Sequence, residues 1–74
     1  MAETHETLLL WRLRAPVHGA SRDVQCTMDH LGESFYELHL QCGREQLLNE
    51  SFEETGTLLA RAQELFAETK ARTV

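Results

Sequence analysis

The residue types that could do chemistry gather in one short stretch, CTMDH at positions 26–30. A cysteine, an aspartate and a histidine within five positions suggest a thiol nucleophile with its base, or part of a metal site. The surrounding segment DVQCTMDH alternates between apolar and polar residues, which predicts a strand with one buried face. At about 3.3 Å per residue, Cys26 and His30 would lie about 13 Å apart, with Asp29 pointing to the opposite face. The stretch therefore predicts a strand rather than a catalytic dyad, and leaves open whether His30 meets a partner from elsewhere in the fold.

Both cysteines fall on the predicted buried face, where a thiol commonly acts as a small hydrophobic group. Antiparallel pairing with the strand that contains Cys42 places Cys26 opposite Leu38, Leu40 or Cys42 itself. Only the last of these registers allows a disulfide. We therefore predict two buried structural thiols.

The remaining sequence offers no recognised catalytic or metal-binding motif. The chain has four histidines, but no Cys-x-x-Cys pair and no His-x-x-x-His on a helix, so no metal site and no cofactor is predicted. It also contains no nucleophile elbow, P-loop or dinucleotide-binding glycine motif. A thin sheet with one helix leaves little volume for an active-site pocket. We predict that the protein is not an enzyme, and keep as an alternative a catalytic site completed at a dimer interface.

Three segments with period-2 alternation predict the strands that must position these side chains. They are TLLLWRLR at 7–14, DVQCTMDH at 23–30 and FYELHLQC at 35–42. In the first of them, strict alternation directs Leu9, Trp11 and Leu13 toward the core.

The connections between these strands differ in length. LGES at 31–34 predicts a hairpin turn and GRE at 43–45 a second tight turn, since glycine adopts the positive φ that such turns need. APVHGAS at 15–21 contains the only proline and a glycine, and predicts an ordered loop. His18 lies in that loop and is the best candidate for a functional loop side chain, because binding residues favour loops on rigid scaffolds.

The period of the apolar pattern changes in the last third of the chain. QLLNESF at 46–52 predicts either a fourth strand or the start of a helix. As a strand it would place Glu50 on the buried face, which requires an edge position where the side chain reaches water. From Glu54 to Arg72 the apolar residues follow helical spacing. This helical stripe consists of Leu58, Leu59, Ala62, Leu65, Phe66 and Thr69.

These elements predict an α+β fold, a small antiparallel β-meander of three strands, or four, packed on one face by a single C-terminal α-helix. We expect a single domain, 1–74, with a flexible N-terminal tail at 1–6. With 74 residues the chain is near the lower limit for folding without a disulfide, a metal or a partner.

The face of the sheet turned away from the helix is predicted to gather apolar side chains near one end. Strict alternation places Leu8, Leu10 and Phe35 on that face together with His39, and these four residues form the candidate interaction surface. Either the N-terminal tail or the loop at 15–21 covers part of it, or a homodimer buries it.

Composition disfavours several classes of partner. Twelve acidic and seven basic residues give a formal net charge of −5, which disfavours nucleic acid. No segment approaches the roughly 20 apolar residues that span a bilayer, and no secretory signal is present. Two cysteines are far fewer than a disulfide-stapled secreted domain contains. We therefore expect a cytoplasmic protein with neither a nucleic-acid nor a membrane partner.

The patterning resembles that of short bacterial proteins of unknown function. The residues that carry the resemblance are V-x-C in the second predicted strand, F-Y-E-L-H-L in the third, G-R after it, and L-L-A-R-A-Q-E-L-F in the helix. Those proteins also combine a three- or four-stranded meander with one C-terminal helix. The resemblance covers nearly the whole chain and implies this fold, but it transfers no site residue.

The function that these observations favour is a non-catalytic protein-interaction module that self-associates through the outer sheet face or an edge strand. The alternative is a small-ligand or regulatory binding module that uses the loop at 15–21 with His18.

Overall fold

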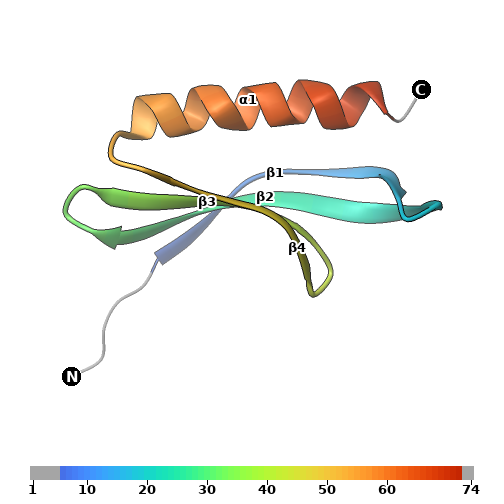
Figure 1. Cartoon of the computed structure of the whole chain (residues 1–74), viewed down its shortest axis with the longest axis horizontal. Coiled ribbons are helices and arrows are strands. Elements are labelled where there is room, and N and C mark those ends of the chain that lie inside the picture. Colours follow the sequence, from blue (N-terminus) through green and yellow to red (C-terminus); the bar gives the residue numbers. More distant parts are fainter. Residues whose placement is uncertain (1–5, 73–74) are drawn as a thin grey trace.

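The computed structural model describes residues 6–72, which form a four-stranded antiparallel sheet and one helix (Figure 1). The strands lie side by side in the order β1-β2-β3-β4, so each strand pairs with its neighbour in sequence. The elements are β1 Glu6–Val17, β2 Ala20–Gly32, β3 Phe35–Cys42, β4 Glu45–Phe52 and α1 Thr55–Ala71. The predicted α+β meander with a C-terminal helix is confirmed, and residues 46–52 belong to a fourth strand. Of the predicted tail at 1–6, residues 1–5 lie outside the described residues and Glu6 begins β1.

The first connection differs from the prediction, because 15–21 is not a loop. β1 continues to Val17 and β2 begins at Ala20, so only His18 and Gly19 form the turn. Their φ angles of 54° and 80° are both positive, as a two-residue type I′ hairpin turn requires. Pro16 is accommodated because β1 is an edge strand, where a residue without an N–H need not break the ladder.

A β-bulge at Leu10 interrupts the regular alternation of β1. Leu9 pairs with Thr27 of β2, and the next pair joins Trp11 to Cys26, so Leu10 is the extra residue. A bulge of this kind places two residues opposite one, and therefore changes the phase of the side chains on either side of it.

The bulge overturns the predicted placement of Leu8 and Leu10 on the outer face. Leu8 pairs with Met28, which packs against the core, and Leu10 itself packs against the core. Strict alternation fails here because an inserted residue shifts every preceding side chain to the other face.

The core lies between the helix and the sheet. Leu38 and Leu58 are fully buried, and Cys26, Ala62 and Leu65 complete the buried cluster. The helical stripe is confirmed except at Leu59, whose side chain is 46% exposed.

Trp11 joins β1 to the helix through two kinds of contact. Its indole Nε1–H donates a hydrogen bond to the carbonyl oxygen of Ala62 at 3.0 Å. Its ring packs edge-on against Phe66, with the ring centroids 5.4 Å apart. These contacts fix the helix above the sheet (Figure 1), where it contacts β1, β3 and β4.

Glu50 lies on the edge strand β4, and an ion pair resolves its unfavourable position. The guanidinium of Arg61 on α1 donates hydrogen bonds to both carboxylate oxygens of Glu50, at 3.0 and 3.3 Å. Hydrogen bonds to Glu50 and Glu64 raise the pKa of Arg61, so this cation stays charged throughout the ordinary pH range. The glutamate therefore reaches across to the helix instead of entering the core.

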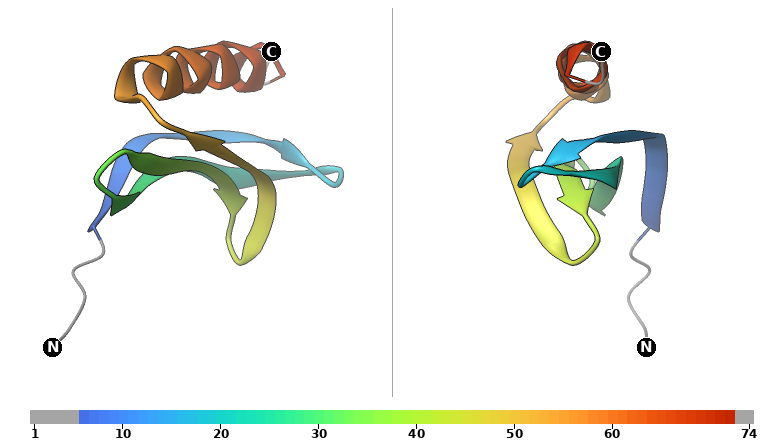
Figure 2. Two further views of the ribbon diagram at one scale, coloured as in Figure 1. Left: turned by 60° about the vertical axis from the view of Figure 1, so that its left-hand side comes forward. Right: turned by 90° about the vertical axis from the view of Figure 1, so that its right-hand side faces the viewer.

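The sheet is strongly curved. Figure 2 shows the β3–β4 hairpin curling away from the helix, and the first residues of β1 bending in the same direction on the other side. We call the sheet face turned away from α1 the concave face. This curvature leaves one end of β1 as a free edge beyond the cover of the helix.

Candidate functional site

Among residues 6–72, the most exposed large apolar side chains lie at the start of β1. Leu8 is 55% exposed and Leu9 is 52% exposed. They point to opposite faces of the sheet, since Leu8 pairs with Met28 and Leu9 with Thr27. The prediction that the exposed apolar surface lies on one face is therefore wrong. This surface wraps around a free strand edge.

A shallow groove of about 380 Å³ runs beside Leu8 on the helix side of the sheet. It is lined by Met28, His30 and Tyr36 as well as by the first residues of β1. The His30 ring stacks on Tyr36, with their centroids 4.7 Å apart and their planes at 13°. The partner of His30 is thus an aromatic ring, and its surroundings are those of a packing residue.

The other two members of the candidate interaction surface are separate from Leu8. Phe35 lies at the start of β3 and lines a hollow with Phe52 and Thr57, beside the beginning of the helix. His39 projects to the concave face, which is the predicted outer face, and polar residues surround it there. The four predicted residues therefore do not form one continuous patch.

His18 occupies the first position of the β1–β2 turn, and its side chain is largely exposed. Its Nε2 lies 2.9 Å from Oε2 of Glu45, the first residue of β4. A groove of about 390 Å³ separates this turn from the second half of α1, with Val17, Leu40 and Leu65 among its apolar lining residues. Ligand binding by this region stays a prediction.

The two cysteines have the surroundings of packing residues. Cys26 pairs with Leu40 and not with Cys42, and both thiols are free and buried. Burial raises the pKa of the Cys26 thiol to about 11, well above the value of 9.0 for an accessible cysteine. Because the thiolate is the reactive form, this shift disfavours a nucleophilic role.

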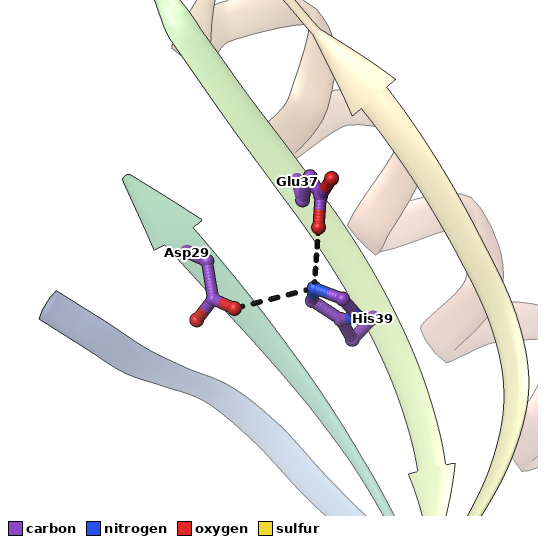
Figure 3. A group of neighbouring side chains, drawn as sticks. All are labelled: Asp29, Glu37 and His39. Carbon is purple, nitrogen blue, oxygen red and sulfur yellow. Dashed lines mark ion pairs between the residues drawn. The ribbon is translucent and has the colours of Figure 1, made fainter. Parts of the chain in front are cut away.

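The concave face carries a group that the sequence analysis did not identify, Asp29, Glu37 and His39. Figure 3 shows the two carboxylates converging on one imidazole nitrogen. The Nε2 atom of His39 lies 3.3 Å from Oδ2 of Asp29 and 3.1 Å from Oε1 of Glu37. Each of the three side chains is at least three-quarters buried.

Sheet register explains why these three side chains meet. Asp29 on β2 pairs with Glu37 on β3, and Thr27 pairs with His39 two positions further along. Residues two apart on one strand share a face, so all three lie together on the concave face. The sequence signal was present in Asp29, Glu37 and His39, which alternation places at outward positions of a hairpin, but only the register of that hairpin joins them.

Polar neighbours surround the His39 ring. The side-chain Nε2 of Gln46 lies 2.7 Å from Nδ1 of His39. The Thr7 hydroxyl donates a hydrogen bond to Oδ1 of Asp29 at 2.6 Å. Nε2 of His39, by contrast, is buried and has no hydrogen-bond partner among the described residues.

Three comparisons with known proteins found no similar protein: no protein-family model, no curated protein and no solved structure matches this chain. The resemblance to short bacterial proteins therefore stays a prediction, while the fold that it implied is observed. Within residues 6–72, the single helix is too short and too polar to cross a bilayer.

Proposed function

We propose that this domain is a non-catalytic protein-interaction module that associates with a second copy of itself by edge-to-edge pairing of β1. The segment that pairs is the start of the strand, residues 6–10. The observation that carries the proposal is the half-exposure of two consecutive leucines, Leu8 and Leu9, at a strand edge.

Because the two leucines lie on opposite faces of the sheet, they favour strand pairing over docking on one face. A partner docked on one face of the sheet would cover either Leu8 or Leu9 and leave the other in water. A strand added beside β1 sends alternate side chains to both faces, and so covers both leucines together. It also satisfies the backbone N–H and C=O groups that an edge strand leaves unpaired.

The rest of the β1 edge disfavours pairing. Arg12 and Arg14 are exposed, and Pro16 lacks the N–H that a ladder requires. The bulge at Leu10 separates this protected half from the apolar half. The contact is therefore confined to the first few residues of β1.

A second copy is the partner that this short segment fits best. Antiparallel pairing of the same segment from two chains is isologous, so it closes on itself as a dimer and does not propagate into a fibre. The small core also supports association, because a chain of 74 residues gains little from burial within one copy.

Nuclear Overhauser effects between differently labelled copies test this proposal. In an equal mixture of ¹³C-labelled and unlabelled protein, we expect intermolecular cross-peaks from the methyl groups of Leu8 and Leu9. Cross-peaks that arise instead from Leu59 or Phe35 would place the contact elsewhere. Their complete absence at millimolar concentration would contradict self-association.

A further inference from the structure

We propose that Asp29, Glu37 and His39 form a binding site for a divalent transition-metal ion, with Zn²⁺ as the reference ion. Nε2 of His39, Oδ2 of Asp29 and Oε1 of Glu37 are the proposed ligand atoms. The site lies on the concave face of the sheet and does not depend on the proposed pairing of β1.

The distances within the cluster fit a common ion. Ligands that each lie about 2.1 Å from one metal are about 3.0 to 3.4 Å apart in octahedral and tetrahedral geometry. The two distances from Nε2 of His39, 3.1 and 3.3 Å, fall within that interval. One ligand atom from each of the three residues lies within 4.8 Å of the others. The remaining pair, one oxygen of Asp29 and one of Glu37, therefore needs only a small side-chain adjustment.

The burial of His39 supplies a second, independent observation. Its Nε2 atom is inaccessible to solvent and has no hydrogen-bond partner among residues 6–72, although two carboxylates lie beside it. Buried polar atoms are nearly always hydrogen-bonded. This nitrogen has instead its ion-pair contacts with the two carboxylates, and a metal ion between the nitrogen and the two oxygens would satisfy all three groups.

Two neighbouring residues supply the support that metal ligands usually have. Nε2 of Gln46 lies beside Nδ1 of His39, and a half-turn of the amide group, which exchanges its nitrogen and oxygen, would present an oxygen that accepts the Nδ1–H. That hydrogen bond places the lone pair on Nε2, where the ion would bind. Thr7 holds the opposite oxygen of the Asp29 carboxylate.

The donor set selects the class of ion. One imidazole nitrogen with two carboxylate oxygens suits Zn²⁺ or Mn²⁺, whereas Ca²⁺ and Mg²⁺ favour oxygen ligands alone. Two carboxylates also balance the charge of a divalent ion. A polar hollow of about 300 Å³ lined by Thr7, Gln25, Thr27 and Gln41 adjoins the cluster and gives water access to the remaining coordination positions.

Calorimetric titration of Zn²⁺ into the full chain, combined with NMR of the histidine rings, tests the site. We expect one ion to bind per chain, with the largest ring shifts at His39. His39→Gln should weaken binding by at least about tenfold, and Asp29→Asn should weaken it comparably. His18→Gln is the matched control, because His18 is an exposed histidine that also faces a carboxylate, and it should leave affinity unchanged.

Three results of the Zn²⁺ titration would overturn the proposal. These are no saturable binding at millimolar Zn²⁺, equal affinity in the wild type and His39→Gln, or an equal loss in His18→Gln. If His39→Gln fails to fold, as shown by loss of amide dispersion, Asp29→Asn decides the question in its place. An equal response to Mg²⁺ would also contradict it, since a nitrogen ligand should discriminate against that ion.

Discussion

Cys26 is fully buried beneath the helix, and that burial gives the protein a specific alkaline weakness. The thiol has a pKa of about 11 in the folded chain, against 9.0 when accessible. Above pH 9 the unfolded chain therefore loses the thiol proton while the folded chain keeps it, so deprotonation favours unfolding. We expect the free energy of unfolding to fall between pH 9 and 11, by at most about 1.4 kcal/mol per pH unit.

Urea denaturation across this alkaline range measures the effect. Cys26→Ala is the control, because it removes the thiol while other groups still titrate, and its stability should decline less steeply. Parallel pH profiles for the two proteins would show that the Cys26 proton is not linked to folding.

His18 occupies a backbone conformation that glycine and asparagine adopt more readily. Its φ of 54° is the first of the two positive angles in the β1–β2 turn. We expect His18→Asn to stabilise the fold by about 0.5 kcal/mol, because Asn-Gly is the preferred sequence of a type I′ turn. The exposed contact with Glu45 contributes little that would be lost. A rise in the urea midpoint checks this, whereas a loss above about 1 kcal/mol would show that the Glu45 contact dominates.

At the scale of the element, α1 offers two adjacent leucines in opposite environments. Leu58 is fully buried, whereas Leu59 is 46% exposed. Leu58→Ala should destabilise the domain by about 2 to 4 kcal/mol, through lost burial and the cavity that remains. Leu59→Ala should cost less than about 0.5 kcal/mol, as typical surface substitutions do. Chemical denaturation of both variants gives the comparison, and similar losses in the two would contradict the orientation of the helix.

The elements differ in how far the sequence could predict them. The helix and the strands 23–30 and 35–42 were predictable, because uninterrupted periodicity follows directly from one buried face. The bulge at Leu10 was not, since an inserted residue leaves no trace in a run of four apolar side chains. The His-Gly turn was missed because Pro16 suggested a loop, although an edge strand tolerates proline.

At the scale of the whole molecule, the candidate sites depend on contacts between strands. The Asp29, Glu37 and His39 cluster needs the register of β2 on β3, and that register depends on the turn at 33–34. Spacing rules for metal ligands search along one segment, so they cannot detect a site divided between two strands. The exposed leucines likewise became informative only when β1 was known to be an edge.

Sedimentation velocity from micromolar to millimolar concentration tests the central claim, self-association through the start of β1, most directly. We expect a mass that rises with concentration from one chain toward two, and a single-chain mass throughout for Leu9→Glu. Leu59→Glu, which places the same charge on a comparably exposed leucine of the helix, should associate like the wild type. A wild type that stays monomeric over the whole range, or a Leu9→Glu variant that still dimerises, would contradict self-association through the start of β1.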